Sequence, residues 1–308
     1  MTDKIIAIQG NHPSKLNPKN DTSIFLANEV QSRYKIFYYD PKDLSIVNSK
    51  IMAKGYFINF TYNNKRYFNI IKEKNLNLEI CKIILIRQDP PFNLEYISST
   101  YILDQIKHKV KIVNDPTSIR NISEKFYSSK YQKYMPQTIY SQNLDEIKLF
   151  FKKNKKVIVK PINSYSGNDI LLMDKFKLKI IKTFIKKHNY IICQKFLTNI
   201  TKGDKRVFII KGKVVGAISR VPKKGSFLSN MSKGAIPINT KLTKTELKIA
   251  KLVAKDLKKE NIYFAGIDFI DEKLNGDINV TSPTGLKTLY DLSKINLAKV
   301  FWKELQNE

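Results

Sequence analysis

The chain has 308 residues and a mass of 35.8 kDa, which is enough for two or three subdomains that each bury a core. A hydrophobic fraction of 42% excludes a disordered chain, and no apolar run approaches the roughly 20 residues of a membrane-spanning helix. The first residues form a short strand pattern and lack the apolar stretch of a signal peptide. We therefore expect a globular, cytoplasmic protein without a membrane partner.

The formal charge of +28 raises the question of a nucleic-acid partner. Only six of the 55 basic residues are Arg, however, and the Lys residues are spread along the whole chain. Proteins that read nucleic acids more often concentrate Arg, because its planar guanidinium fits phosphates and base edges. We expect no nucleic acid as the primary partner, and a Lys-rich nucleic-acid-binding protein stays open as an alternative of a different class.

In the first third of the chain, short apolar runs alternate with amphipathic stretches, which predicts a partly parallel α/β sheet. The predicted strands are residues 4–9, 35–40, 82–87 and 110–114, and the predicted helices are 23–32 and 94–108. Residues 45–63 are predicted to form a meander. Cys81 and Cys193 each lie in an apolar run, which is typical of buried, reduced thiols rather than of a disulfide or a metal site.

The remaining two thirds continue with both kinds of element. Residues 118–131 are predicted to be a helix, and residues 138–197 read strand, helix, strand (156–161), polar loop, strand, helix (177–188) and strand (190–197). Residues 206–218 form a predicted hairpin that turns at 211–213, and 222–234 a mobile loop. A helix over 242–260, a second hairpin that turns at 272–276, and a helix over 289–305 complete the prediction.

Two lysines are candidate phosphate ligands. Lys160 ends a β-branched strand and precedes a loop of small residues that contains Ser164 and Gly167. An ammonium group in this position can hold a phosphate while the loop N–H groups contact its oxygens. Lys125 lies on an earlier predicted helix and is a second candidate. The alternative for Lys160 is an ordinary junction between a strand and a loop.

Three oxygen-bearing side chains near the C-terminus are candidate metal ligands. Asp277 and Asn279 are two residues apart on a predicted strand and therefore share one face. Asp268 lies in the other arm of the same hairpin, within an apolar strand where an unpaired carboxylate would be costly. Hard oxygen ligands of this kind suit Mg²⁺ that is bound through substrate phosphates. Asp277 alone could instead be a polar residue beside a turn.

Together these residues resemble the ATP-grasp ligases, and several strings resemble one family, the prokaryotic-type glutathione synthetases. The most specific strings are Ile-Arg-Gln-Asp-Pro-Pro-Phe (86–92) and Ile-Asn-Val-Thr-Ser-Pro-Thr (278–284). Further matches are Thr-Tyr-Ile-Leu (100–103), Ser-Glu-Lys-Phe (123–126), Gly-Asp-Lys-Arg-Val (203–207), Arg-Val-Pro (220–222) and Phe-Ala-Gly-Ile-Asp (264–268). They follow the order of the family from about residue 4 to the end of the chain.

The resemblance implies an α/β (α+β) ATP-grasp fold in three parts. These would be a Rossmann-like N-terminal substrate domain (1–122), a central lid subdomain (123–199) and a C-terminal ATP-grasp subdomain (200–308). It also implies that ATP phosphorylates the cysteinyl carboxylate of γ-glutamylcysteine and that the amine of glycine then displaces phosphate. The expected cofactor is Mg²⁺ or Mn²⁺, and the expected assembly is a homo-oligomer, a tetramer in the family.

The resemblance further implies roles for individual residues of this chain. Arg206, Arg220 and Lys160 would act in catalysis. ATP would be bound by Lys125, Lys160, Ser164, Gly167, Gln194, Lys195, Leu197 and Asp204, with Asp204 near the ribose. The peptide substrate would contact Arg87, Asp89, Arg220 and Asn230. The metal ligands would be Asp268, Asp277 and Asn279.

Four features depart from the pattern of the family. The phosphate loop is poorer in Gly, Asp277 stands where Glu is usual, Leu228 and Ile236 stand where Arg is expected, and Gly10-Asn11-His12 replaces an expected Asp. Lys223, Lys224 and Lys233 could supply charge in place of the missing Arg residues. Because such loops protect a labile acyl phosphate from water, a related carboxylate–amine ligase with another peptide or amine substrate is the second hypothesis.

Overall fold

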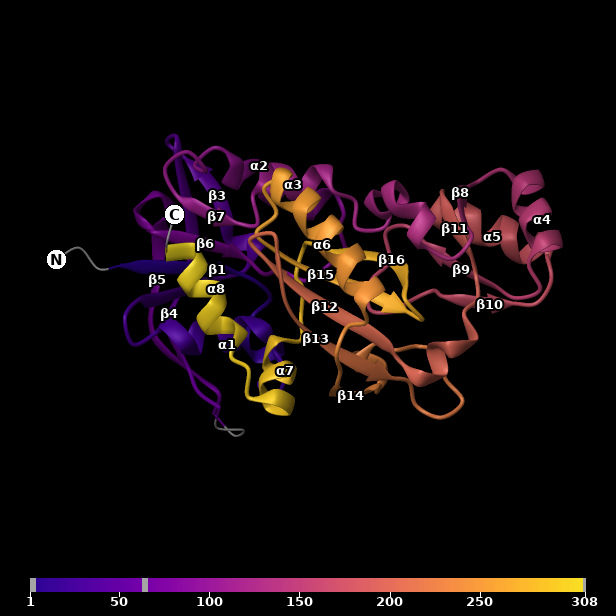
Figure 1. The fold of residues 1–308 in the computed structure, drawn as a ribbon. Coiled ribbons are helices and arrows are strands. Elements are labelled where there is room, and N and C mark those ends of the chain that lie inside the picture. Colours follow the sequence, from indigo (N-terminus) through magenta and orange to yellow (C-terminus); the bar gives the residue numbers. More distant parts are fainter. Residues whose placement is uncertain (1–3, 63–65, 307–308) are drawn as a thin grey trace.

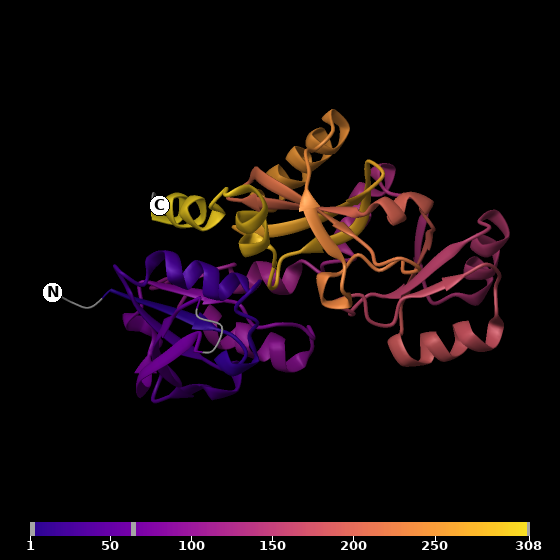
Figure 2. The same ribbon diagram turned by 90° about the horizontal axis from the view of Figure 1, so that it is seen from below.

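The computed structural model describes residues 4–62 and 66–306, arranged as three sheets along an elongated molecule (Figure 1). The first and second sheets lie at opposite ends, and the third lies between them in both views (Figures 1 and 2). The end of the predicted meander at residue 63 falls outside the described residues. No helix in the described ranges has both the length and the apolar character needed to cross a membrane.

The first sheet has the strand order β3-β4-β2-β1-β6-β7, and β5 pairs with β4. Its strands are β1 (Ile5–Gln9), β2 (Lys35–Tyr39), β3 (Leu44–Val47), β4 (Lys50–Phe60), β5 (Phe68–Asn77), β6 (Ile83–Ile86) and β7 (Lys111–Val113). The helices of this part are α1 (Thr22–Val30), α2 (Leu94–Asp104) and α3 (Pro116–Asn121). The pairs of β1 with β2 and β6, and of β6 with β7, are parallel, while β3, β4 and β5 form the antiparallel meander. The predicted partly parallel sheet is confirmed.

The second sheet lies in the part that was expected to be the lid, which is called the lid below, and it has its own core. Its antiparallel strands, in the order β10-β9-β11-β8, are β8 (Thr138–Ser141), β9 (Val157–Pro161), β10 (Leu171–Met173) and β11 (Ile191–Lys195). Two amphipathic helices, α4 (Leu144–Lys153) and α5 (Leu178–His188), supply Ile147, Phe150 and Ile181 to that core. Cys193 is buried there as a free thiol, as predicted, and burial raises its pKa to about 12.

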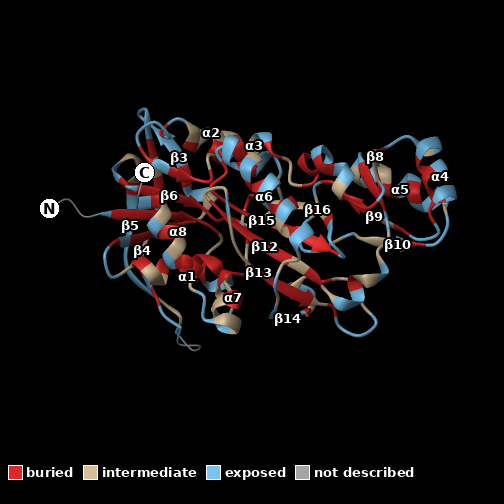
Figure 3. Ribbon diagram, in the orientation of Figure 1, coloured by how far each residue is buried: buried red, intermediate tan, exposed pale blue. Residues whose placement is uncertain are grey.

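The third sheet is antiparallel, with the order β14-β13-β12-β15-β16. Its strands are β12 (Asp204–Ile210), β13 (Lys213–Val221), β14 (Ile236–Asn239), β15 (Phe264–Ile270) and β16 (Lys273–Asn279), and the helix α6 (Lys244–Lys259) covers one face. Strand β15 is buried along its whole length, and β12 is buried except at Lys205, which is half-buried (Figure 3). The predicted hairpin at 211–213 is confirmed, because Ile210 pairs with Lys213.

Two predicted helices are wrong in their extent. Residues 118–131 are divided between α3 and the 3₁₀ helix η4 (Tyr127–Tyr134), and the backbone is extended at Ile122. The break places the carboxylate of Glu124 where it accepts hydrogen bonds from the backbone N–H groups of Val280 and Thr281, at 2.8 and 3.0 Å. A tertiary contact therefore overrides the local helical pattern.

The C-terminal helix is also two helices, α7 (Leu286–Ser293) and α8 (Leu297–Gln306). Lys294 has a left-handed backbone with φ of 62°, which ends α7. Asn296 then accepts hydrogen bonds from the N–H groups of Ala298 and Lys299 and thereby caps the start of α8. The predicted turn over 272–276 is wrong as well, because β16 already begins at Lys273.

The N-terminal and C-terminal parts share one hydrophobic core. It contains Ile6 and Leu26 from the first part together with Phe208 and Trp302 from the last. Helix α8 lies against α1, and Trp302 Nε1 donates a hydrogen bond to the carbonyl oxygen of Leu26 at 2.9 Å. The predicted boundaries at 122 and 199 fall between the sheets, but α8 returns to the first sheet. The three-domain division stays a prediction.

Asn114, directly after β7, fixes the first sheet to the third. Its side-chain amide donates to the carbonyl oxygens of Phe264 and Val280 at 2.8 and 2.7 Å. Its side-chain oxygen accepts from the N–H groups of Tyr263 and Phe264 at 3.0 and 2.8 Å. The residue is buried, so water cannot replace these bonds.

Replacing Asn114 by Ala should lower the free energy of unfolding by at least about 3 kcal/mol, because several buried backbone groups lose their partners. Urea denaturation measures this change. Asn121→Ala, at an exposed position of α3, is the control and should change stability by less than about 0.5 kcal/mol. Equal stability of the two variants would contradict the bridging role of Asn114.

Candidate active site

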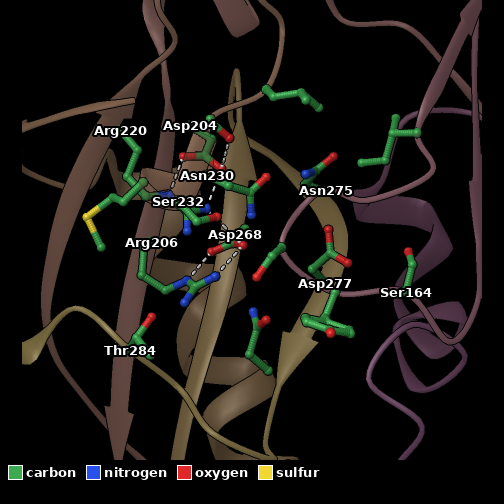
Figure 4. Close-up of a pocket in the computed structure, with 18 of the residues that line it drawn as sticks. Ser164, Asp204, Arg206, Arg220, Asn230, Ser232, Asp268, Asn275, Asp277 and Thr284 are labelled. Atoms are coloured by element: carbon green, nitrogen blue, oxygen red, sulfur yellow. Dashed lines mark hydrogen bonds and ion pairs between the residues drawn. The ribbon is translucent and has the colours of Figure 1, made fainter. Parts of the chain in front are cut away.

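A cavity of about 660 Å³ lies where the lid, the third sheet and the N-terminal part meet. Figure 4 shows Asp204, Arg206, Asp268 and Asp277 from the third sheet facing Ser164 of the lid. Residues 222–234, which connect β13 to β14 and are called the cleft loop below, form part of the wall. On the N-terminal side the wall includes Asp21 and Asp89.

Two ammonium groups converge on one carboxylate in this cavity. The Nζ atoms of Lys125 and Lys160 lie 3.6 and 3.7 Å from the two carboxylate oxygens of Asp277. Lys125 Nζ also donates to the carbonyl oxygen of Ser164, and Lys160 Nζ donates to that of Asn275 at 2.9 Å. Lysines that are far apart in the chain therefore meet at the end of β16.

A β-bulge in the hairpin of β15 and β16 determines the positions of Asp268 and Asp277. Ile267 pairs with Ile278 and Phe269 with Leu274, so residues 275–277 lie opposite the single residue Asp268. Gly276, with φ of 92°, supplies the left-handed backbone for this bulge. Alternate residues of β16 then line the cavity, namely Asn275, Asp277 and Asn279.

Asp268 is held by two arginines from the neighbouring strands. Arg206, on β12, donates through Nε and Nη2 to both of its carboxylate oxygens, and the second distance is 2.9 Å. Nη2 of Arg220, on β13, lies 3.0 Å from Oδ2 of the same carboxylate. Arg220 also donates through Nε and Nη2 to Asp204, and the first distance is 2.8 Å. All four residues are at most 6% exposed.

Burial raises the pKa of the acidic side chains in the cavity and lowers the pKa of the basic ones. Burial alone raises the pKa of Asp268, but the positive charges of Arg206 and Arg220 outweigh it and lower the pKa to about 2. Burial lowers the pKa of Lys160 from its ordinary value of 10.5, Asp277 opposes this shift, and Lys125 adds to it. The negative charge of Asp277 is therefore not enough to compensate the burial of Lys160, and an anionic ligand beside it would raise its pKa.

The donor atoms at the end of the third sheet fit a hard cation. Asn279 Nδ2 donates to the carbonyl oxygen of Gly266 at 3.0 Å, which fixes the amide and leaves its oxygen on the other side. That oxygen and the carboxylates of Asp268 and Asp277 are the ligand types that Mg²⁺ accepts together with phosphate oxygens. Within the described residues, no group of three or more His, Cys, Asp or Glu side chains could hold a metal by itself.

All the predicted site residues except Arg87 line this cavity. Gln194 is buried and donates from Nε2 to the Thr138 hydroxyl at 2.9 Å, on the lid side with Lys195 and Leu197. Asp89, on the opposite side, accepts from Asn11 Nδ2 at 2.9 Å.

Arg87 is buried and does not line the cavity, although the neighbouring residue Asp89 does. Its Nε donates to the Ser23 hydroxyl at 3.2 Å, and its buried Nη1 atom has no hydrogen-bond partner among the residues that the structure describes. The structure thus shows the positions of the predicted residues, and their individual roles stay predictions.

Several residues of the site were missed by sequence reasoning. Glu124 lies in the helix predicted over 118–131 and Asn275 in the turn predicted over 272–276, and a polar residue in either place does not by itself indicate a site. Asp21 is the N-cap of α1, where it accepts from the N–H group of Ile24 at 2.8 Å, so a capping signal was available but not a binding signal. Ser229, in the cleft loop, is buried and carries no recognisable motif.

The departures in the cleft loop can also be located. Leu228 lines the cavity, whereas Ile236 begins β14 and is 61% exposed. Lys223, Lys224 and Lys233 are exposed and are not among the described residues of the cavity wall. Charge from these lysines therefore does not replace the missing arginines in this arrangement.

Solved structures with the same fold include two synthetases and an ATP-grasp ligase. D-alanyl-alanine synthetase A from Vibrio cholerae superposes with a TM-score of 0.64 at 14% identity, over 100% of this chain and 98% of that chain. The D-cycloserine synthetase DcsG gives 0.66 at 10% identity, over 97% of this chain and 99% of that chain. The ATP-grasp ligase PsnB, complexed with a precursor variant, Mg and ADP, gives 0.65 at 12% identity, over 100% and 99%. The protein therefore has the predicted ATP-grasp fold.

Sequence relatives identify the family. Residues 5–120 match the prokaryotic glutathione synthetase N-terminal domain, and residues 124–294 match the ATP-grasp domain of the same enzymes. Glutathione synthetase from Bradyrhizobium diazoefficiens is 33% identical over 98% of both chains, and that from Buchnera aphidicola is 34% identical over 95% of this chain and 93% of its own. The chain belongs to the prokaryotic glutathione synthetase family and is an ATP-dependent, ADP-forming ligase.

The lowered pKa of Lys160 predicts proton uptake when a nucleotide binds. At alkaline pH below 10.5 the free enzyme keeps part of this ammonium neutral, and a bound triphosphate raises its pKa again, so a proton is taken up. Titration calorimetry with a non-hydrolysable ATP analogue, in buffers of different ionisation enthalpy, measures this uptake. The Lys160→Arg variant stays protonated and should take up less. Equal uptake in both proteins would contradict the assignment.

Proposed function

We propose that this protein joins the cysteinyl carboxylate of γ-glutamylcysteine to the amine of glycine and converts ATP to ADP and phosphate. The proposal rests on one observation above all, the convergence of Lys125 and Lys160 on Asp277 in a cavity that also contains the Arg206–Asp268–Arg220 group. The membership of the chain in the glutathione synthetase family supports this choice of substrates.

The side chains suit a reaction that depends on positioning and on charge neutralisation. Lys125 and Lys160 would hold the phosphates of ATP, with the loop at Ser164 and Gly167 beside them. Gln194, Lys195 and Leu197 would contact the adenine. Arg206 and Arg220 would face the carboxylate that receives the phosphoryl group, where planar guanidinium groups stabilise the developing negative charge. No protein nucleophile is needed, because the substrate carboxylate attacks the phosphorus.

Asp268, Asp277 and Asn279 would hold Mg²⁺ or Mn²⁺. When bound, the cation would neutralise negative charge on the phosphates. In the described structure Asp268 already accepts from both arginines, and Asp277 contacts both lysines. These carboxylates therefore balance the cationic side chains before ligands bind. Their second task would be to present oxygen atoms to the cation.

Action in the cytoplasm and assembly as a homotetramer are further proposals that follow from the family. A related ligase with another peptide or amine remains the second candidate, and the uncharged wall of the cleft loop favours it. The six residues that the loop contributes to the cavity are Phe227, Leu228, Ser229, Asn230, Met231 and Ser232.

The purified protein should release ADP from ATP only when γ-glutamylcysteine and glycine are both present. A coupled assay for ADP measures the rate, and mass spectrometry identifies the peptide product. A panel of other dipeptides and amines is the comparison. A faster rate with a different pair, together with a poor rate with γ-glutamylcysteine and glycine, would favour the second candidate.

The Lys160→Ala variant should lose at least about 99% of kcat and remain folded, because a buried cation at the phosphates contributes several kcal/mol to the transition state. Lys155→Ala, at an exposed position five residues earlier, is the matched control and should keep the wild-type rate. Steady-state kinetics and circular dichroism check both variants. Wild-type turnover of Lys160→Ala would refute the role of Lys160.

A further inference from the structure

The cleft loop contacts the lid at several points. The ring of Phe227 lies edge-on to that of Phe196, with centroids 6.3 Å apart. Lys233 Nζ donates to the side-chain oxygen of Asn168 at 2.8 Å. Gly167 lies so close to the loop that a Cβ atom there would come within 2.5 Å of the side-chain oxygen of Asn230. The loop is therefore in a closed position, packed against the lid beside the cavity.

One polar side chain of the loop is buried. Ser229 is 8% exposed, whereas the other polar residues between positions 222 and 234 are half-buried or exposed. Its hydroxyl donates a hydrogen bond of 2.6 Å to Oδ2 of Asp204, at the start of β12. A hydrogen bond to a buried carboxylate is stronger than one between neutral groups. This bond joins the loop to the third sheet.

The bond continues into the group of arginines at the reacting end of the cavity. The oxygen of Asp204 that accepts from Ser229 also accepts from Nη2 of Arg220, and the other oxygen accepts from Nε of Arg220 at 2.8 Å. The Nη2 atom of Arg220 in turn lies 3.0 Å from Asp268. A buried chain of hydrogen bonds thus runs from the loop through Asp204 to Arg220 and Asp268.

We propose that Ser229 is a positioning residue that couples closure of the cleft loop to the orientation of Arg220. When the loop lies against the lid, the hydroxyl fixes the carboxylate of Asp204, and Asp204 fixes the guanidinium that faces the substrate carboxylate. When the loop moves away, the carboxylate of Asp204 loses the hydrogen bond from Ser229 and keeps those from Arg220, so Arg220 is held less firmly. The proposal rests on the proposed function, because it assigns Arg220 to the substrate carboxylate.

A pair of variants of equal shape isolates the hydroxyl. Ser229→Thr keeps it and Ser229→Val lacks it, while both add similar bulk. The Val variant should have a kcat about 10- to 100-fold below that of the Thr variant, the effect of one hydrogen bond to a charged group. Both carboxylate oxygens of Asp204 accept from Arg220, so the proposal assigns this carboxylate to Arg220 in place of the expected ribose contact, and the KM for ATP should be nearly the same in both variants. Equal kcat values for Thr and Val would overturn the proposal.

A second measurement tests the contact without any reaction. Lys223, Lys224 and Lys233 are exposed in the loop, so trypsin reports how often it opens. The Val variant should be cut several-fold faster than the Thr variant, and equal rates would overturn the proposal whatever the substrates prove to be. If the wild-type protein shows no ligation although the trypsin result holds, the proposed function fails and the contact between loop and sheet stands.

Two controls exclude trivial explanations. Ser226→Ala removes a loop hydroxyl that accepts from the N–H group of Leu228 at 3.0 Å, a contact within the loop itself. It should keep the wild-type kcat, whereas a loss equal to that of Ser229→Val would show that general loosening of the loop is responsible and would overturn the proposal. If Ser229→Val does not fold, Ser229→Ala replaces it, because that change adds no bulk.

Discussion

The structure of the cavity depends on the mutual neutralisation of buried charges. Two lysines and two arginines are kept from water, and each is placed beside a carboxylate that is itself buried or half-buried. Isolated charges in such surroundings would be prohibitively costly. Pairing with carboxylates allows these cationic side chains to stay charged in the buried cavity before an anionic substrate binds. Burial lowers the pKa of Lys160 although Asp277 opposes the shift, so this ammonium group is only partly compensated.

Much of the fold could be predicted from the sequence, because most elements follow from local periodicity. Strand β6 in the first sheet is a continuous apolar run, β15 is apolar except at Asp268, and α6 begins with a capping box formed by Thr243 and Glu246. The failures occur where distant contacts decide the local conformation. Glu124 interrupts a helical pattern because its carboxylate binds the backbone of residues 280 and 281. The bulge opposite Asp268 likewise depends on Gly276 and on packing that no short window reveals.

The sequence predicts those residues of the candidate site that stand in an unusual local context. Lys160 and Asp268 stand out because a charged residue is unexpected in or beside an apolar strand. Ser229 and Asn275 do not stand out, because a polar residue in a polar loop or turn is ordinary. Their positions become meaningful only when the loop and the hairpin are folded against the lid. Proximity in space, and not residue type, identifies them.

The absence of Arg at positions 228 and 236 changes which parts of the site supply positive charge. Because the described wall residues of the loop carry no charge, the positive charge proposed for the reacting carboxylate would come from Arg206 and Arg220 on neighbouring strands of the third sheet. Groups on such strands are held more accurately than groups on a loop. The loop is then free to serve as a cover that excludes water, and Ser229 connects its position to the sheet. The contact between Ser229 and Asp204 is needed because the arginines are fixed in the sheet whereas the loop moves. Without this contact, closure of the loop would not affect the orientation of Arg220.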